Sequence, residues 1–139
     1  MIDVFDALRL AFDTGMLALI WLVQLIIYPG LAMYNDVNLR IWHPIYTKRV
    51  TLVVLPLMFG QLILSAYKVL NVGVLTDDIH LVLVLSAWAI TFLRAVPLHR
   101  ALEGEDGGAN IAIRLVHVNK ARTIVWSLAW IVSLVILLL

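Results

Sequence analysis

The sequence predicts an all-α protein: an integral membrane four-helix bundle of up-down-up-down topology, forming one domain over residues 1–139. Two observations predict it. Of the 139 residues, 63% are hydrophobic and only 14% are charged, whereas about a quarter of a typical soluble domain is charged. The charges also cluster between four long apolar runs. A membrane-spanning segment must satisfy its own backbone hydrogen bonds, and a helix does so within one segment.

The four helices are expected at residues 14–34, 44–70, 79–102 and 109–139. At a rise of 1.5 Å per residue, such runs are long enough to cross about 30 Å of hydrocarbon. Pro29 and Gly30 are expected to kink or end the first helix. The second contains Pro56, which neighbouring helices help to accommodate in a spanning segment. The third contains Arg94 and Pro97 near its end.

The connections between these runs are short. Residues 71–78 predict a turn followed by a helix start, and residues 104–108 (GEDGG) predict a tight turn before the fourth helix. Short connections favour antiparallel neighbours, which gives the up-down-up-down order.

The lysines and arginines predict the orientation. Four antiparallel helices place both termini and the middle connection on one side, where only Arg9 and Lys68 are basic and where several aspartates lie. The other eight basic residues fall on the opposite side: Arg40, Lys48, Arg49, Arg94, Arg100, Arg114, Lys120 and Arg122. Because basic residues concentrate on the cytoplasmic side, the sequence predicts a multi-pass inner (plasma) membrane protein with both termini outside the cytoplasm.

Composition narrows the expected chemistry and partners. The chain has no cysteine, which excludes disulfides, thiolate metal sites and cysteine nucleophiles. A net charge of +1 without a basic stripe gives no reason to expect a nucleic-acid partner. The expected partners are the lipid bilayer, a small hydrophobic molecule and a second copy of the chain in a homo-oligomer.

Polar residues gather at the basic end and form the candidate site. His43, Tyr46 and Arg49 open the second helix at i, i+3 and i+6, and were expected to lie roughly on one side of it. In the fourth helix, Asn119, Arg122 and Trp126 form one stripe at i, i+3 and i+7. The expected ligand-binding residues are His43, Tyr46, Arg49, Arg94, His99, Asn119, Arg122 and Trp126.

Two other interpretations compete for these residues. Basic residues near helix ends commonly extend to the lipid headgroups and report only topology. Arg94 is different because it follows a purely apolar stretch, and an ionisable group at that depth usually faces the bundle interior. Three histidines at one depth, His43, His99 and His117, could hold a metal or haem. They lack the ligand spacing of two histidines on one helix, and no deep acid lies beside them, so no metal site is expected. Acid–base chemistry would use His43 or His99.

A second polar stripe lies within the apolar runs. Trp21, Gln24 and Tyr28 recur at i, i+3 and i+7, and Gln61 and Ser65 on the second helix are expected to face them. Such residues often hydrogen-bond between helices in membranes. The alternative is that they line a pocket for a planar hydrophobic ligand.

Three segments together resemble a family of small bacterial four-helix membrane proteins. They are HPIYTKRVTLVVLPLMFGQLI, WAITFLRAVPLHRALEG and RLVHVNKARTIVWSLAW. The shared elements fall at His43, Tyr46, Arg49 and Thr51; at Val96, Pro97, Leu98 and His99; and at Asn119, Arg122 and Thr123. More distantly, the chain is similar to anthrone oxygenase-like membrane proteins, which implies four helices and cofactor-free oxygenation of a polycyclic aromatic substrate.

The leading prediction is a membrane protein that binds a small hydrophobic or anionic ligand in a polar pocket at its cytoplasmic end. Arginines would hold the ligand's phosphate, carboxylate or phenolate, and Trp88 and Trp126 would flank its apolar part. The first alternative is an oxygenase or oxidoreductase acting on a quinone-like or polycyclic aromatic substrate. The second alternative is an accessory or structural subunit of a membrane complex.

Overall fold

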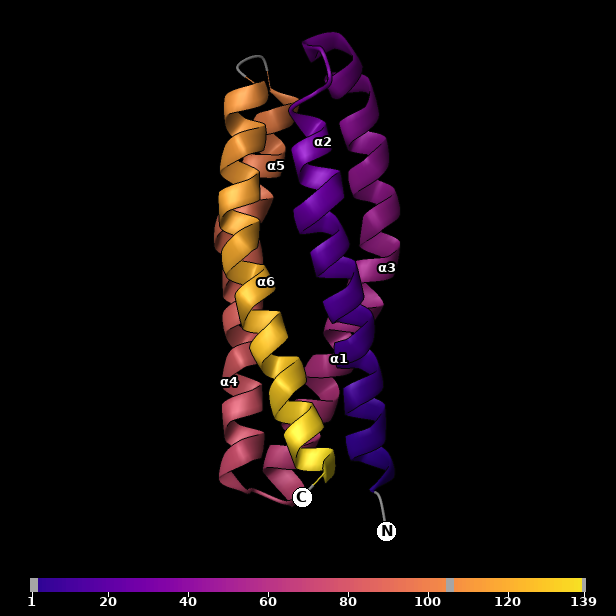
Figure 1. The fold of residues 1–139 in the computed structure, drawn as a ribbon, viewed down its shortest axis with the longest axis vertical. Coiled ribbons are helices and arrows are strands. Elements are labelled where there is room, and N and C mark those ends of the chain that lie inside the picture. Colours follow the sequence, from indigo (N-terminus) through magenta and orange to yellow (C-terminus); the bar gives the residue numbers. More distant parts are fainter. Residues whose placement is uncertain (1–2, 105–106, 139) are drawn as a thin grey trace.

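The computed structural model describes residues 3–104 and 107–138, and every regular element within these ranges is a helix. Figure 1 shows long helical segments lying side by side, with α1 beginning and α6 ending at the same, lower end of the bundle. Within the described ranges, four helical segments are long and apolar enough to cross a membrane. The predicted all-α fold with four such helices is confirmed.

Two of the four segments are uninterrupted and two contain a wider turn. The first consists of α1 (Val4–Leu22), the π-helical turn η1 (Val23–Ile27) and α2 (Tyr28–Leu31); the second is α3 (Asp36–Asn71); the third consists of α4 (Leu75–Ile90), the π-helical turn η2 (Thr91–Ala95) and α5 (Val96–Glu103); and the fourth is α6 (Ala109–Leu138).

Short polar side chains and a glycine set several helix boundaries. The Asp3 carboxylate accepts from the Phe5 amide at 3.1 Å, and the Asn35 amide oxygen accepts from the Asn38 amide at 2.8 Å, so both residues cap helix N-termini. With Asn35 as its cap, the second helical segment begins at Asp36 rather than at the predicted residue 44. After α3, Gly73 adopts φ +66° and its amide donates to the Lys68 carbonyl. Glycine reaches this left-handed conformation without a steric cost, which is why it commonly ends helices.

Both π-helical turns come just before a proline. Pro29 and Pro97 lie at the second positions of α2 and α5. A proline lacks an amide donor and its ring collides with the carbonyl four residues earlier. In the wider turns, the amides of Tyr28 and Val96 instead reach the carbonyls five residues back. The first helical segment is therefore not ended at the Pro29–Gly30 pair and continues to Leu31.

The lower end of the bundle has a charged interior. The first helix begins at Val4 rather than at residue 14. The charged residues of its early turns, Asp6, Arg9 and Asp13, belong to the helix and lie on the buried side of α1. Arg9 is fully buried, and its guanidinium donates to Asp6 at 2.9 Å and to Asp77 at 2.6 Å. A charged helical stretch is compatible with burial here because the charges neutralise one another inside the bundle.

Two sequence-based boundaries involve residues outside the described ranges. The turn predicted at residues 104–108 includes residues 105 and 106, and the predicted end of the last helix is residue 139. On either side of that turn, the Gly107 amide donates to the Gly104 carbonyl at 3.1 Å.

Candidate functional site

A cavity of about 290 Å³ lies between the helical segments, in the half of the bundle that holds α5. Its deep end is apolar, with Met16 and Ile20 from α1 and Val54 from α3. Toward the upper end of the bundle in Figure 1 its wall becomes polar. The polar lining residues are Tyr28, Tyr46, Thr47, Thr51, Thr91, His99, Arg100, Glu103 and Arg122. An apolar cavity with a few convergent polar groups is the usual form of a small-molecule site.

The π-helical turns position the cavity wall. Val23 of η1, and Thr91 and Ala95 of η2, all line the cavity. Each wider turn changes the rotational register of the helix that follows it. Tyr28 lies on α2, which follows η1, and His99 lies on α5, which follows η2. Single π-helical turns of this kind occur frequently at functional sites.

A chain of hydrogen bonds runs along the polar part of the wall. The Tyr28 hydroxyl lies 2.8 Å from His99 Nε2, and His99 Nδ1 lies 2.9 Å from His43 Nε2. His43 Nδ1 in turn lies 2.9 Å from the carboxylate of Glu103. His43 is fully buried, whereas the Glu103 side chain is 37% exposed. The chain therefore leads from a buried phenol to a carboxylate at the surface.

The chemistry of its end groups sets the direction of this chain. A carboxylate only accepts hydrogen bonds, so His43 donates to Glu103 through Nδ1. With both imidazoles neutral, His43 then accepts through Nε2 from Nδ1–H of His99, and His99 accepts through Nε2 from the Tyr28 hydroxyl. Every link has one donor and one acceptor, so a proton leaving Tyr28 can be passed on to Glu103.

Arg122 supplies a buried positive charge beside this chain. The residue is only 5% exposed, and its guanidinium donates to the Asn119 amide oxygen at 3.1 Å and to the Tyr28 hydroxyl at 3.5 Å. The guanidinium carbon also lies 5.0 Å from the centre of the Trp126 ring, a cation–π contact. All these partners are neutral, and in the ranges 3–104 and 107–138 no carboxylate forms an ion pair with Arg122.

The structure brings six of the eight predicted ligand-binding residues together. Tyr46, His99 and Arg122 line the cavity. The other three contact those lining residues: His43 bonds to His99, and Asn119 and Trp126 contact Arg122. Of the two candidate proton acceptors, His99 faces the cavity and His43 lies behind it.

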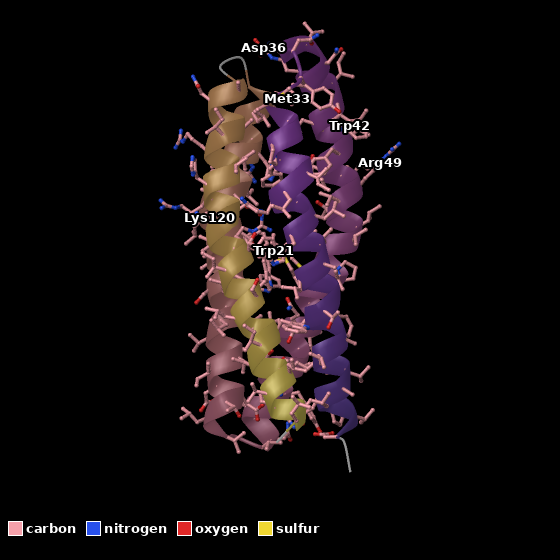
Figure 2. All side chains as sticks on the ribbon, viewed as in Figure 1. Trp21, Met33, Asp36, Trp42, Arg49 and Lys120 are labelled. Atoms are coloured by element: carbon pink, nitrogen blue, oxygen red, sulfur yellow. The ribbon has the colours of Figure 1, made fainter. Side chains whose placement is uncertain are left out.

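Arg49 and Arg94 do not belong to this group. Both are exposed, and Figure 2 shows Arg49 projecting away from the bundle. Arg49 follows His43 by six residues, which places it about 120° around the helix from His43. Arg94 belongs to η2, whose buried residues are Thr91 and Ala95. The expectation that Arg94 faces the interior was therefore wrong.

Sequence reasoning missed parts of the site. Tyr28 was placed in a separate stripe with Gln24, yet it bonds to His99, and Gln24 accepts from Asn119 at 2.9 Å. Glu103 was not among the expected site residues, although its position four residues after His99 puts both on one helix face. Trp88 was expected to flank the ligand, but it packs against Phe59 and Phe92 and is not among the cavity-lining residues.

No protein-family model, curated protein or solved structure matches the chain. The function of the chain is therefore inferred from the geometry and charge of the site itself.

Proposed function

We propose that the bundle spans the inner membrane with its basic end in the cytoplasm and both termini outside it. The difference in exposed basic residues between the two ends of the bundle supports this orientation. At the basic end, seven of the eight lysines and arginines are exposed, and Figure 2 shows Lys120 and Arg49 projecting from opposite sides. At the other end, Arg9 and Lys68 are buried and paired with aspartates. Exposed basic residues thus mark one end only, as the positive-inside rule expects of a cytoplasmic side.

The length of α3 supports a cavity mouth near water in the proposed orientation. With 36 residues, α3 is about 54 Å long, whereas the hydrocarbon of a bilayer is about 30 Å thick. Part of α3 therefore extends beyond the hydrocarbon, and Arg40, Lys48 and Arg49 in its first turns indicate that this part is cytoplasmic. Glu103, which pairs with His43 in the same region, then lies at the membrane surface.

Labelling of single cysteines tests this topology, because the chain has no cysteine of its own. Asp78 and Asn110 are exposed residues near opposite ends of the bundle. In intact bacterial cells, a membrane-impermeant maleimide should label Asp78→Cys, and it should label Asn110→Cys only after the membrane is permeabilised. The reverse pattern would contradict the orientation, and a protein recovered from the aqueous fraction would contradict membrane insertion.

The cavity is proposed to bind a small ligand with an apolar body and an anionic or acidic hydroxyl head group. The observation that carries this proposal is Arg122, a buried cation on the cavity wall that lacks a carboxylate partner among the described residues. Burying a charge is costly unless an opposite charge compensates it, and a ligand head group beside the guanidinium would do so. The apolar floor at Met16, Ile20 and Val54 would take the body of the ligand. A bundle without a cavity would favour the accessory-subunit interpretation, so the cavity supports ligand binding instead.

Filling the cavity tests the proposal. Ala95 is 2% exposed and lines the cavity, whereas Ala89 in the same helical segment is exposed. Native mass spectrometry of the protein in nanodiscs should find a small molecule bound to the wild type and to Ala89→Leu, and little or none bound to Ala95→Leu. Equal occupancy in both variants, or no bound molecule in any sample, would contradict a ligand site in this cavity.

The hydrogen-bond chain favours a second candidate function, an oxygenase or oxidoreductase that removes a proton from a phenolic or quinone-like substrate. Its specific support is the path Tyr28–His99–His43–Glu103, whose links measure 2.8 to 2.9 Å. Such a path accepts a proton inside the cavity and delivers it to the surface, while Arg122 stabilises the resulting oxyanion.

Glu103→Gln tests the proton path at its surface end. The glutamine keeps the shape of the side chain but cannot take up the proton, and general-base contributions are typically about 10²- to 10⁴-fold. With an anthrone as the reductant of dioxygen, oxygen consumption by Glu103→Gln should therefore fall by about 10²-fold or more. Asp78→Asn, an exposed carboxylate at the other end of the bundle, should consume oxygen at the wild-type rate. Unchanged turnover in Glu103→Gln would rule out this path.

A further inference from the structure

A second group of buried polar side chains lies in the half of the bundle away from the basic end. Asp13 of α1 and His80 of α4 are both fully buried, and the His80 Nε2 atom lies 2.8 Å from the Asp13 carboxylate. Three further fully buried residues surround the pair: Gln61 and Ser65 on α3, and Ser133 on α6. Gln61 and Ser65, expected to face Trp21 and Tyr28, face this pair instead.

Fixed donors around the pair determine where its protons lie. Ser65 has one hydroxyl proton and lies 2.6 Å from the Gln61 backbone carbonyl, which only accepts; with that bond made, the imidazole donates through Nδ1 at the 2.8 Å contact with His80. The Trp126 indole donates to the Gln61 amide oxygen at 3.0 Å, which turns the Gln61 amide nitrogen toward Asp13 at 2.6 Å. Ser133 also donates to Asp13.

The contact between His80 Nε2 and Asp13 then requires one more proton. With Nδ1 already protonated, Nε2 and the carboxylate oxygen are both acceptors unless one of them carries a proton between them. The pair therefore holds two protons and has zero net charge, whether it is written as imidazolium and carboxylate or as imidazole and carboxylic acid. Loss of the shared proton would leave His80 neutral and Asp13 ionised, changing the net charge of the pair from zero to minus one.

No other positive charge among the described residues pairs with Asp13 in place of that proton. Among the described residues, His80 is the only ion-pair partner of Asp13. Below the pair, the two buried bases Arg9 and Lys68 are matched by the two buried acids Asp6 and Asp77. The charge of Asp13 is therefore balanced only by the proton that it shares with His80.

A series of ion pairs lies between this pair and the bundle end that holds the termini. Asp77 lies one helical turn before His80 and bonds to Arg9, while Arg9 and Lys68 share Asp6. Lys68 also reaches Asp3 at 2.8 Å, outside the helical segment. That hydrogen bond, together with the one from the Phe5 amide, lowers the pKa of the Asp3 carboxyl from its ordinary value. An ionised carboxylate therefore stands at the outer end of the series.

The pair also lies just beyond the floor of the ligand cavity. Met16, which lines that floor, follows Asp13 by three residues on α1, or about 4.5 Å along the helix axis. Gln61 connects Asp13 to Trp126, and the ring of Trp126 lies against Arg122 of the cavity wall. The pair is thus placed between the outer ion pairs and the cavity.

We propose that Asp13 and His80 form a proton-exchange site of this protein, which binds and releases the shared proton toward the bundle end that holds the termini. Inter-helix hydrogen bonds alone could be made by uncharged side chains, as Ser65 and Gln61 show. An ionisable pair at this depth is costly and commonly marks a functional site, proton relays among them. This inference does not depend on which ligand the cavity binds.

Nitrogen NMR of the protein in nanodiscs tests the proposal directly. Ile79–His80 is the only Ile–His sequence in the chain, so carbonyl-labelled isoleucine combined with ¹⁵N-histidine identifies His80 without a variant. The wild type should show a protonated Nδ1 and a strongly downfield proton between Nε2 and Asp13. That proton should exchange with D₂O faster than the amide proton of Val84, which is fully buried in the same helix.

Two variants distinguish a proton shared by Asp13 and His80 from a buried pair that only holds the helices together. In Asp13→Asn the amide can donate to Nε2, so the downfield proton should disappear while Nδ1 stays protonated. In Ser133→Ala the pair remains complete, so the downfield proton should persist. An unprotonated Nδ1 in the wild type, an Asp13→Asn spectrum that keeps the downfield proton, or exchange as slow as that of Val84 would each overturn the proposal.

Discussion

Arg122→Met should lose the ligand without losing stability. Among the described residues, the guanidinium is the one buried cation of the cavity wall. Charged hydrogen bonds contribute about 1.5–3 kcal/mol each, which corresponds to roughly ten- to hundredfold in affinity. Because the described chain gives Arg122 only neutral partners, removing its charge leaves no carboxylate unpaired. Native mass spectrometry should therefore find the cavity largely empty, while the melting temperature of the ligand-free variant equals or exceeds that of ligand-free wild type.

Arg114→Met is the matched control for this prediction. Arg114 lies on the same helix but is exposed, and its replacement should change neither ligand occupancy nor melting temperature. If Arg122→Met unfolded the protein while Arg114→Met did not, Arg122 would be a structural residue, and the argument for an anionic or acidic ligand would lose its basis.

The sequence predicted the spans well because their signal is local. A long uncharged run predicts a helix whatever surrounds it, and the predicted start of the last helix coincides with the observed one at Ala109. The first helix was predicted too short because its early turns contain Asp6, Arg9 and Asp13. Those charges are compatible with a buried helix only if partners lie on other helices. One of the two partners of Arg9, Asp77, is 68 residues away in the chain, beyond what a local pattern can show.

The site was predicted in part for the same reason. Asn119, Arg122 and Trp126 share a stripe at regular spacing on an uninterrupted helix, and they do lie together. The segments before Tyr28 and His99 each contain a π-helical turn. A pattern based on 3.6 residues per turn loses its register at such a turn, so neither the pairing of Tyr28 with His99 nor the outward position of Arg94 could be read from spacing.

Arg9→Met should strongly destabilise the bundle. Arg9 and Asp77 are both fully buried, and the guanidinium donates to Asp77 at 2.6 Å and to Asp6 at 2.9 Å. Without Arg9, Asp6 keeps Lys68 as a partner, but Asp77 is left as a buried charge without a counterion. Breaking a buried pair in this way typically costs about 3–5 kcal/mol. The loss should appear in the free energy of unfolding measured in mixed detergent micelles.

A double-mutant cycle with Asp77→Asn tests that cause. Arg9→Met/Asp77→Asn leaves Asp77 uncharged, so it should be more stable than Arg9→Met alone, with a coupling energy of about 2 kcal/mol. Asp78→Asn changes the adjacent, exposed carboxylate and should alter stability by no more than about 0.5 kcal/mol. Additive effects of the two single substitutions would show that the side chains do not act as a pair.

The contrast between the two buried arginines is the strongest test of where the ligand binds. Both are almost completely removed from solvent, yet Arg9 is neutralised by carboxylates of the chain and Arg122 is not. If burial alone set the importance of an arginine, the two methionine variants would be destabilised alike. Because carboxylates balance the charge of Arg9 and no described carboxylate balances that of Arg122, only Arg9→Met should lose stability and only Arg122→Met should lose the bound molecule.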